Sequence, residues 1–475
     1  MIKRIAIIGG GTSGLAAAYE LEKQRRAGAP VGYTVLEQAP RLGGVLVSER
    51  VEGCLVEAGP DSFLTEKPWA AALCREIGLG GQIIGSNDDE RRTFIVVRNR
   101  LVEMPDGLMF MVPTKLLPTL LTPLFSWTTK IRMGLELRSR PHTLHGDESV
   151  AAFVERHYGT EVVDRLADPL LSGVYGADAD KLSVRAVLPR FIDMEQRHGS
   201  LTRGMLAARR RMAQMFKDKP KPPLFSSLHQ GMQQMVDALV SHLEPHALRP
   251  GAEVCRVEFN GHEWLLVTAG GAQAFDAVIF ATPAHVASTL LRDTDTALAE
   301  DLGGISYSSS VTTNLIYRRA EIARRDPGFG FLVPRSEGRR MLACTFVHHK
   351  FPHRAPDDLA IVRGFLGGLR DPQAVELDEQ EIVGTIRREL REITGIAAEP
   401  LAVRVYRWRR AMSQPSPGHL ERIARIEARL AQLPGLALAG NYFRGIGVPD
   451  CVRTGQEAAR KVGVALPQPS SPARV

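Results

Sequence analysis

The stretch IAIIGGGTSG at residues 5–14 constrains the fold of this chain more than any other part of the sequence. The β-branched residues 2–8 predict a short strand, and the Leu and Ala pattern after Gly14 predicts a helix. Glycines between a strand and a helix are typical of dinucleotide binding. Gly9 permits the tight turn, Gly11 admits a pyrophosphate, and Gly14 lets helix and strand pack closely. The helix N-terminus supplies N–H groups and partial positive charge for the phosphates.

A second strand, YTVLE, completes a β-α-β unit, which requires a parallel strand pair with a right-handed crossover. Its last residue, Glu37, can accept hydrogen bonds from both ribose hydroxyls and would repel a 2′-phosphate, which disfavours NADP. Arg41 can neutralise phosphate charge, and Gly43 and Gly44 let the chain pass close beneath a cofactor. A further glycine turn, EAGPDS, occupies residues 57–62. Two such loops suit a chain that wraps a permanently bound FAD better than one that exchanges a nicotinamide cofactor.

The end of the chain carries a third glycine-rich turn, in LALAGNYFRGIGVPDCVRTGQEAA at residues 436–459. A predicted strand leads into Gly440, after which Gly445 and Gly447 precede a helix with Pro449 in its first turn. This aims another helix N-terminus at a ligand, which suits negative charge on the pyrimidine ring of a reduced flavin. An ordinary strand–turn–helix that binds nothing is the alternative.

Composition and cysteine spacing exclude several classes of function. The net charge of +7 fits an anionic ligand or an anionic membrane surface, whereas the Lys and Arg residues are scattered and no nucleic-acid module is present. The five cysteines show no CxxC or Cys/His spacing, so we predict neither a metal site nor a disulfide framework. No secretory signal precedes the first strand, and we therefore expect a cytoplasmic protein.

Residues 106–127, DGLMFMVPTKLLPTLLTPLFSW, form the most lipid-like segment. Three prolines and Lys115 interrupt it, so it lacks the unbroken apolar stretch of about 20 residues that spans a bilayer. Three interpretations remain open. The segment is a surface that rests peripherally on the inner face of the cell membrane, the mouth of an apolar pocket, or an internal core surface.

The order of elements predicts an α/β fold, α+β overall, in which a Rossmann-like FAD-binding domain is interleaved with a mixed-sheet substrate domain and a mainly helical domain. FIVVRNRLVEM at 94–104 predicts a hairpin, and KDKPKPP at 217–223 predicts a linker. The predicted domains are 1–88, 222–302 and 432–466 for FAD binding, 89–221 for the helical substrate- or membrane-facing region, 303–431 for the substrate-binding sheet, and 467–475 for a disordered tail.

Together the three glycine signatures resemble the FAD-dependent amine-oxidase-like superfamily, which includes amine oxidases, carotene desaturases and porphyrinogen oxidases. Segments 168–191, 328–356 and 447–451 resemble the oxygen-dependent protoporphyrinogen/coproporphyrinogen III oxidase family. GPDSF at 59–63 resembles its bacterial branch, whose members act on coproporphyrinogen. The resemblance covers almost the whole chain. It implies oxidation of a porphyrinogen to a porphyrin in haem biosynthesis, with noncovalent FAD, O2 as acceptor, H2O2 as product, and handover of the tetrapyrrole to a ferrochelatase-type enzyme.

The resemblance also implies residues for both ligands. FAD would contact Gly9, Gly10, Gly11, Thr12, Ser13, Gly14, Glu37, Val45, Gly59, Pro60, Asp61, Ser62, Val254, Asn441, Ile446, Gly447 and Val448, beside the Arg41, Gly43 and Gly44 already named. The tetrapyrrole would lie between Leu332 and Phe346, with Val174, Tyr175 and Gly176 lining the same cleft. An apolar pair suits a flat macrocycle, which has large faces and few polar groups. Plain core positions remain the alternative for Val254, Leu332 and Phe346.

Carboxylate binding is where the sequence departs from the family pattern. The family arginine that binds a propionate aligns with Thr93, and Arg91 and Arg92 directly precede it. Either arginine could hold a carboxylate through two hydrogen bonds, or both belong to a solvated turn. Arg92, next to Thr93, is the candidate substrate contact.

We predict no catalytic side chain. Aromatisation of the macrocycle is strongly downhill, so the protein mainly needs to place a ring carbon against flavin N5 and exclude water. His348 and His349, expected to continue a strand after Phe346, are therefore given no role. Two alternatives stay open: an amine oxidase or carotenoid desaturase on the same scaffold, and a noncatalytic flavin-binding protein. The first is poorly supported, because only Tyr442 and Phe443 are available for the aromatic cage of an amine oxidase.

Overall fold

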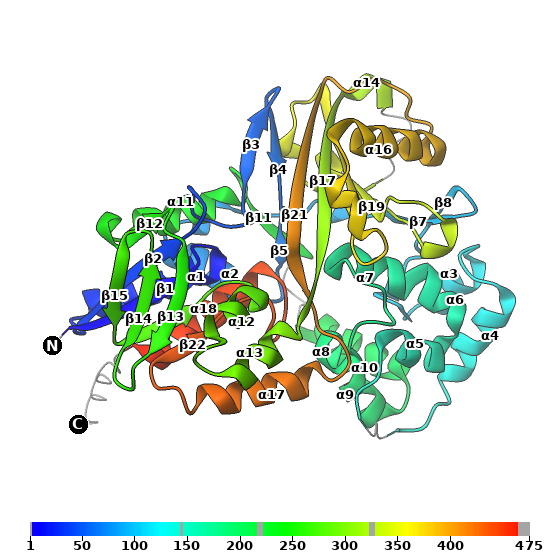
Figure 1. Ribbon diagram of the computed structural model, residues 1–475. Helices are drawn as coiled ribbons and strands as arrows, with labels where there is room; N and C mark the ends of the chain where they lie inside the picture. Colours follow the sequence, from blue (N-terminus) through cyan, green and yellow to red (C-terminus); the bar gives the residue numbers. More distant parts are fainter. Residues whose placement is uncertain (1, 143–145, 216–221, 323–327, 464–475) are drawn as a thin grey trace, which may run out of the picture.

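The computed structural model describes residues 2–142, 146–215, 222–322 and 328–463, which form two sheet regions and a helical region (Figure 1). The first sheet is parallel and has the strand order β12-β2-β1-β16-β22. Helix α1 (Thr12–Arg26) connects its first two strands and completes the predicted β-α-β unit. The strands are β1 (Lys3–Ile8), β2 (Val31–Glu37), β12 (Leu248–Pro250), β16 (Ala277–Phe280) and β22 (Leu436–Leu438).

The alternation of side chains along β1 divides the packing of this sheet between two cores. Ile5 and Ile7 belong to the core on one face, and Ala6 and Ile8 belong to the core on the other. The first face packs against α1, α2 (Pro68–Glu76), α11 (Gln233–Ser241) and α18 (Val448–Val462). The second packs against β13 (Val254–Phe259), β14 (Trp264–Thr268), β15 (Gly271–Phe275), α12 (Ala284–Leu291), α13 (Thr296–Gly303) and α17 (His419–Leu430).

The second large sheet is mixed, with the order β21-β17-β20-β19-β18-β7-β8. Only the β7–β18 pair is parallel, and the other neighbours are antiparallel. Helix α16 (Glu379–Thr394) covers one face of this sheet (Figure 1). Its strands are β7 (Thr93–Val97), β8 (Arg100–Glu103), β17 (Ser306–Arg318), β18 (Gly330–Leu332), β19 (Ala343–Phe346), β20 (Leu359–Gly367) and β21 (Ala402–Gln414).

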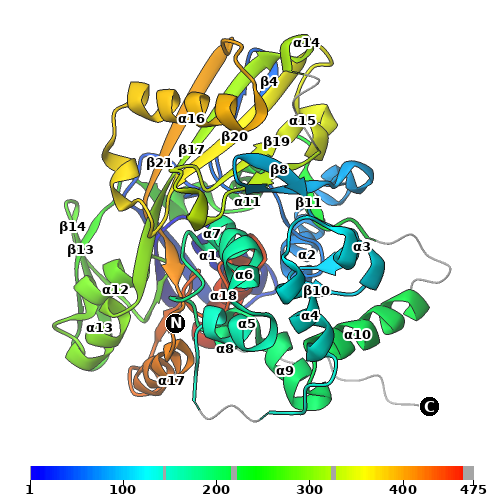
Figure 2. The ribbon, with the colours of Figure 1, turned by 90° about the vertical axis from the view of Figure 1, so that its right-hand side faces the viewer.

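The helical region lies beside the other face of the mixed sheet, on the side turned toward the viewer in Figure 2. Its core includes Ile95 of β7, and Leu332 of β18 packs against it. Its helices are α3 (Leu116–Leu121), α4 (Trp127–Glu136), α5 (Val150–Tyr158), α6 (Thr160–Val162), a π-helical turn (Val163–Ala167), α7 (Asp168–Tyr175), α8 (Val184–Val187), α9 (Pro189–His198) and α10 (Leu201–Met215).

Short elements connect these regions. The small strands are β3 (Ser48–Val51), β4 (Cys54–Glu57), β5 (Phe63–Leu64), β6 (Ile83–Gly85), β9 (Leu108–Met109), β10 (Val112–Pro113) and β11 (Phe225–Leu228). The short helices are α14 (Arg319–Ile322) and α15 (Val347–Lys350), with 3₁₀ turns at Gly80–Gln82, Asp88–Glu90, Pro245–Ala247, Arg335–Glu337, Pro352–Arg354 and Pro372–Glu376. Figure 1 shows β3, β4, β5 and β11 between the two large sheets, so they bridge the part that resembles a dinucleotide fold and the mixed sheet.

The α/β fold class is confirmed, and the predicted hairpin at 94–104 is the β7–β8 pair. The expectation for His348 and His349 was wrong. Pairing with β20 ends at Phe346, and the chain then forms the one-turn helix α15. The predicted tail and most of the predicted linker lie outside the described residues, and the domain boundaries stay a prediction. Among the described residues, no helix combines the length and apolar character that crossing a bilayer requires.

Candidate cofactor and substrate site

Four parallel strands end at one edge of the first sheet. Gly9 follows β1, Glu37 ends β2, Ala281 follows β16, and Gly440 lies two residues beyond β22. The hydrogen-bond ladder continues into these turns, because the Gly9 N–H donates to Leu36 O and the Ala281 N–H donates to Ile8 O, both at 2.8 Å. Residues from both ends of the chain therefore meet at one edge, where ligands bind in open parallel sheets.

The predicted glycine turn has the geometry of a phosphate cradle. A Cβ on Gly14 would lie 1.9 Å from Gly9 O, and a Cβ on Gly9 would lie 2.7 Å from Ala281 O. These two glycines are required by packing. A Cβ on Gly11 would meet nothing closer than Gly44 Cα at 3.9 Å, so Gly11 faces open space. Gly11 is also the N-cap of α1 and has no side chain to cap the first-turn N–H groups of Thr12 and Ser13, which fits a pyrophosphate.

Glu37 is fixed at the end of β2 by the turn itself. One carboxylate oxygen accepts the Gly10 N–H at 2.7 Å, and the other accepts the Ala39 N–H at 2.8 Å. Each carboxylate oxygen has a further lone pair for a ribose hydroxyl. Val254 lies beside this strand end, where the Ala252 N–H donates to Glu37 O at 2.8 Å, and its side chain is buried in the adjoining core.

Arg41 holds the loop that follows. Its guanidinium donates to Leu42 O at 3.0 Å and also to Gly44 O. Burial lowers the pKa of Arg41, and the nearby Glu37 acts in the opposite direction. Arg41 therefore holds its own loop in place through hydrogen bonds to backbone carbonyls, in addition to the phosphate contact that the sequence predicts. The loop also links the two predicted glycine turns, because a Cβ on Gly44 would lie 3.2 Å from Gly11 Cα and a Cβ on Gly59 would lie 2.1 Å from Val45 O.

A hydrogen bond and an ion pair fix the C-terminal turn where it enters α18. Asp450, in the first turn of α18, accepts the Gly447 N–H at 3.2 Å and pairs with Lys67 at 2.6 Å. Gly445 has φ +128°, and a Cβ there would lie 2.4 Å from the Asp450 carboxyl carbon. Val448 is buried and Ile446 is half-buried between these fixed points. Lys67 and Asp450 carried no signal in the sequence, because 383 residues separate them.

Asn441 is oriented by the end of β21. Its side-chain amide donates to Ala411 O at 2.9 Å, and its backbone carbonyl accepts the Ser413 hydroxyl at 2.7 Å. Around the same sheet edge, the buried polar atoms Thr282 Oγ1, His285 Nδ1 and Tyr442 Oη have no hydrogen-bond partner among the described residues. Buried polar atoms without partners are costly, so they fit an edge that receives a polar cofactor.

The predicted pair Leu332 and Phe346 does not form one slot. Leu332 pairs with Ala343 of β19, and Phe346 lies three residues further along that strand, so the two side chains project to opposite faces. Phe346 is 0% exposed and packs with Phe331 in the core beneath α16. The pairing register, which the sequence alone does not give, separates them.

Phe365 of β20 shares the Leu332 face instead. It pairs with Ala343, which in turn pairs with Leu332, and its side chain is half-buried. Helix α7 faces this wall, since a Cβ on Gly173 would lie 3.6 Å from Leu332 Cδ2. Val174 on α7 is 54% exposed. The sequence offered no sign of Phe365, because its face depends on long-range pairing.

The end of α7 approaches the cofactor edge. Gly176 adopts φ +60°, and a Cβ there would lie 2.4 Å from Met412 Cε. Tyr175 O accepts the Gln414 side-chain amide. Burial, reinforced by Asp450, raises the pKa of Tyr175 to about 12, so its hydroxyl stays neutral. Arg92 lies outside this cluster. Its side chain is exposed, and its backbone carbonyl accepts the Phe329 N–H at 2.9 Å.

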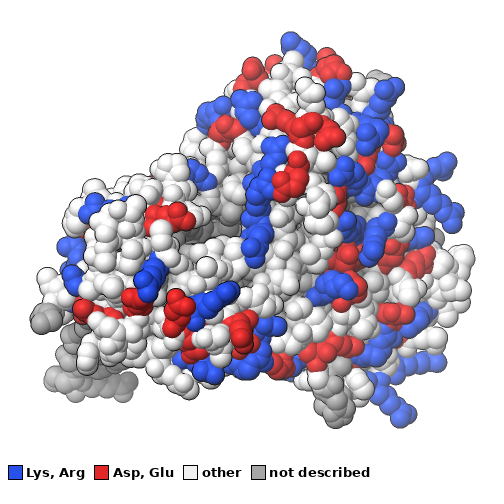
Figure 3. Space-filling view, viewed as in Figure 1, with Lys and Arg blue, Asp and Glu red and all other residues white. Residues whose placement is uncertain are grey.

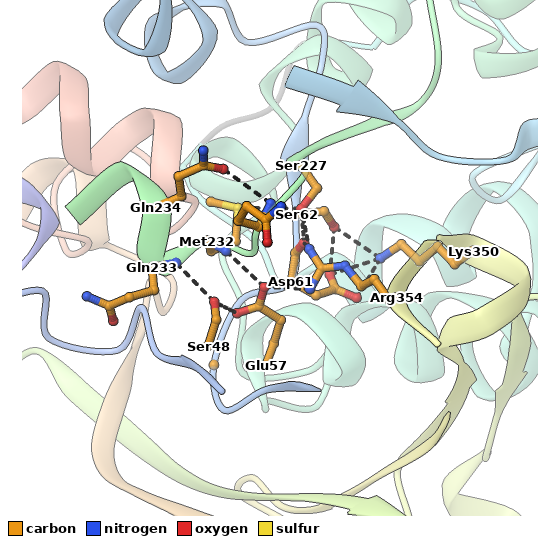
Figure 4. A network of polar contacts seen from close by, with 12 residues as sticks. Ser48, Glu57, Asp61, Ser62, Ser227, Met232, Gln233, Gln234, Lys350 and Arg354 are labelled. Carbon is orange, nitrogen blue, oxygen red and sulfur yellow. Dashed lines mark hydrogen bonds and ion pairs between the residues drawn. The ribbon is translucent and has the colours of Figure 1, made fainter. Parts of the chain in front are cut away.

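A buried charge network surrounds the second predicted glycine turn, and we call it the Asp61 cluster: Glu57, Asp61, Lys350, Arg354 and Arg363. Figure 4 labels its members other than Arg363. Lys350 Nζ lies 3.0 and 3.1 Å from the two Asp61 oxygens and 3.0 Å from Ser62 Oγ. Burial opposes the charge on Asp61, but Lys350 and Arg363 more than offset it and hold its pKa below the usual range. The three cations were missed, because they lie about 290–300 residues from Asp61 and Glu57 in sequence.

Comparisons with known proteins agree with this arrangement. The family model for flavin containing amine oxidoreductase matches residues 12–463. Coproporphyrinogen III oxidase from Bacillus subtilis is 31% identical over 459 residues, covering 96% of this chain and 97% of that protein. The chloroplastic protoporphyrinogen oxidase of Nicotiana tabacum is 29% identical, covering 96% and 84% of the two chains.

Among solved structures, one from Exiguobacterium sp. 255-15, described provisionally as a protoporphyrinogen oxidase, has a TM-score of 0.85 and 30% identity over 97% of this chain and 98% of that one. A putrescine oxidase structure, at 17% identity and a TM-score of 0.68, shares the fold. The chain therefore belongs to the flavin-containing amine oxidoreductase family and is an oxidoreductase whose cofactor is FAD.

Proposed function

We propose that this chain oxidises a porphyrinogen, coproporphyrinogen III or protoporphyrinogen IX, to the porphyrin in haem biosynthesis. The names of its relatives favour this substrate class. The observation that carries the proposal is the apolar surface that Leu332 and Phe365 form on one sheet face, with α7 and its exposed Val174 facing it. Apolar walls suit the large faces of a tetrapyrrole, whereas an amine would call for a polar or aromatic cage.

The residues of the chain position the substrate and keep out water. Leu332, Phe365 and Val174 would hold the macrocycle by its faces, at the sheet edge where the predicted FAD contacts lie. When bound, FAD supplies a two-electron acceptor that O2 reoxidises, so one porphyrinogen and three O2 give one porphyrin and three H2O2. Side chains need not take up the pyrrole protons, which can pass to solvent as aromaticity develops.

We propose that FAD is held noncovalently by the glycine turns, Glu37 and the C-terminal turn. Cys451 is the thiol in the first turns of α18, and burial raises its pKa to about 11. A neutral thiol is a poor nucleophile, which argues against a covalent link to the cofactor. Release of the yellow chromophore by acid or heat without proteolysis tests this point.

One experiment decides the substrate class. The purified yellow protein is mixed in air with coproporphyrinogen III, protoporphyrinogen IX, putrescine or a carotenoid, and porphyrin fluorescence or H2O2 is followed against a protein-free blank. We expect at least one porphyrinogen to be oxidised faster than its blank. Oxidation of neither porphyrinogen would overturn the proposal, and turnover of putrescine or the carotenoid alone would favour the alternative scaffold function. A preference between the two porphyrinogens identifies the step in the pathway.

We further propose that the face formed by α3 and α4 rests on an anionic membrane. Met111, Val112, Leu124 and Phe125 of the lipid-like segment are buried, whereas the apolar side chains on the outer face are exposed. These exposed residues are Leu117, Leu121, Trp127, Ile131 and Leu135, and Leu121 is 74% exposed. Isolated exposed apolar residues are ordinary, but a continuous set on two adjacent helices indicates an interaction surface.

Basic residues border this apolar face. Arg132 on α4, Arg138 two residues after α4, and Arg209, Arg210 and Arg211 on α10 are exposed. Arg209 Nη1 lies 3.4 Å from Thr114 Oγ1, next to α3. Figure 3 shows uncharged surface at the right-hand edge, where α4 lies, with Lys and Arg side chains above and below it. Such a pattern suits anionic lipid. A membrane surface would also give the porphyrin, whose ring faces are apolar, a route to a ferrochelatase-type enzyme.

A further inference from the structure

The Asp61 cluster contains more positive than negative charge. Lys350, Arg354 and Arg363 supply three cations, and Asp61 and Glu57 supply two carboxylates. All five side chains are buried or nearly so, with Arg354 at 0% and Lys350 at 11% exposure. One positive charge is therefore left without a carboxylate inside the protein. Such a charge is costly to bury unless an anion or a developing negative charge lies close to it.

The carboxylates of the cluster are already engaged by other donors. Glu57 accepts the Ser48 hydroxyl at 2.6 Å and the Met232 N–H at 2.9 Å, in addition to Arg354 at 2.5 Å. The flanking carboxylates are also paired with cations of their own, Glu49 with Arg404 at 3.4 Å and Asp450 with Lys67 at 2.6 Å. The excess positive charge is thus not neutralised by these neighbouring carboxylates.

The cluster surrounds the backbone of residues 57–62. Arg363 donates to Gly59 O, and Arg354 donates to Asp61 O at 3.3 Å and to Ser227 Oγ at 2.7 Å. Lys350 is enclosed from the other side by the Phe225 ring, with Nζ 4.5 Å from the ring centroid. In Figure 4, Lys350 and Arg354 converge on Asp61 and Ser62 from one side. The charge is therefore fixed in place.

Two observations point from the cluster toward the cofactor. Gly59 packs on Val45, and Gly44 packs on Gly11 of the phosphate cradle, so the cluster is separated from that cradle by one loop. Arg363 also projects from the sheet face that carries Leu332 and Thr345, and its buried Nε has no partner among the described residues. An acceptor or negative charge on this side would satisfy it.

We propose that the excess positive charge of the Asp61 cluster stabilises the negative charge that bound FAD gains on reduction, and that Lys350 is the positioning residue that supplies it. In each turnover a hydride leaves a substrate carbon and two electrons and one proton enter FAD, which gains one negative charge. The cluster favours that charge through space and thereby raises the reduction potential. The inference depends on FAD alone, so it stands or falls separately from the choice of substrate.

Substitutions that shift the charge in opposite directions test this inference. Lys350→Met removes one positive charge, and Glu57→Gln removes one negative charge while keeping its shape. The midpoint potential of bound FAD is measured anaerobically by equilibration with a redox dye, without substrate. Lys350→Met should lower the equilibrium constant for two-electron reduction about tenfold, a fall of about 30 mV, and Glu57→Gln should raise the potential by a similar amount. Structural damage would not produce shifts of opposite sign.

A matched control separates charge from hydrogen-bond geometry. Lys350→Arg keeps the positive charge while changing the hydrogen bonds to Asp61, so it should retain the wild-type potential. If Lys350→Met does not retain FAD, the Glu57→Gln measurement decides alone. A rise in potential supports the proposal. Potentials that stay constant or move in the same direction in Lys350→Met and Glu57→Gln overturn it.

Discussion

The glycines of the phosphate cradle have different structural roles, although the sequence does not distinguish them. Gly14 is occluded by backbone, whereas Gly11 faces open space. Gly11 also has φ −75° and ψ −171°, which alanine adopts readily. The strand-to-helix packing thus rests on Gly14, and access of a phosphate rests on Gly11.

Gly14→Ala and Gly11→Ala should therefore fail differently. We expect Gly14→Ala to destabilise the folded protein by about 3 kcal/mol, because backbone must move to admit the methyl group. Gly11→Ala should leave the thermal midpoint of the apoprotein nearly unchanged and raise the Kd for FAD about tenfold or more, about 1.4 kcal/mol. Thermal unfolding of both apoproteins and titration with FAD give the comparison. Equal loss of stability in the two variants would contradict this division.

Arg92 and its neighbour offer a test of carboxylate binding. Arg91 Nη1 lies 3.7 Å from Asp88 Oδ2, whereas Arg92 is exposed at the residue before β7. If Arg92 binds a propionate, Arg92→Gln should raise the KM for coproporphyrinogen III about tenfold with little effect on kcat, because a charged hydrogen bond contributes about 1.5–3 kcal/mol. Arg91→Gln serves as the control and should change neither constant. Steady-state fluorescence assays measure both.

At the scale of elements, the register of β18, β19 and β20 decides which apolar side chains face the proposed substrate and which are buried in the core. Leu332→Ala and Phe365→Ala should raise KM for the porphyrinogen and cost less stability than Phe346→Ala, because both are only half-buried, on the sheet face that α7 faces. Phe346→Ala should instead cost about 3–5 kcal/mol of stability, as expected for a fully buried aromatic. Urea unfolding and steady-state kinetics separate the two effects. A selective KM effect of Phe346→Ala would show that the assignment of faces is wrong.

Three helices of the helical region are joined by one buried histidine. His157 of α5 lies 3.2 Å from Glu136 of α4 and 3.1 Å from Glu195 of α9. Burial acts to lower the pKa of His157, but the two carboxylates outweigh it and the pKa is raised. Glu136 also accepts the Leu201 N–H at the start of α10, so the charged histidine neutralises a carboxylate that holds the next helix.

The pH dependence of stability follows from that raised pKa. A histidine with a raised folded pKa contributes fully below its unfolded value of about 6.5, and the contribution is lost as the pH rises through the folded value. The stability difference between wild type and His157→Gln should therefore be largest near pH 6 and smaller at higher pH. Urea unfolding across this range measures it. His246→Gln, at a side chain that is 80% exposed, should show little pH-dependent difference.

Features formed by residues close together in the sequence could be predicted, whereas features formed by distant residues could not. The cradle at residues 9–14 and Glu37 are local features, and the structure brings them to one sheet edge as expected. Phe365 and Lys350 could not be found, because their roles depend on strand register and on contacts with residues far away in the sequence. The pairing of Leu332 with Phe346 failed for the same reason, since both are apolar and only the register sets their faces.

For the whole molecule, the α3–α4 face predicts reversible membrane binding. The protein should sediment with vesicles that contain phosphatidylglycerol, less so at high salt, and only weakly with neutral vesicles. Leu121→Glu combined with Ile131→Glu should abolish sedimentation. Leu401→Glu, which changes an exposed leucine elsewhere, should have no effect. Sedimentation of the double variant equal to that of wild type would exclude this face as the membrane contact.

The convergence of both ends of the chain at one sheet edge has a consequence for biosynthesis. Strand β22 and helix α18 occupy residues 436–462, so they are made long after β1, α1 and β2, yet they complete the same cofactor edge. A nascent chain can form the first β-α-β unit early, but it lacks the second part of the cofactor edge until residues 436–462 have been made. Flavin binding that needs both parts therefore cannot precede the synthesis of α18, and a stop codon before residue 436 would leave a product without colour.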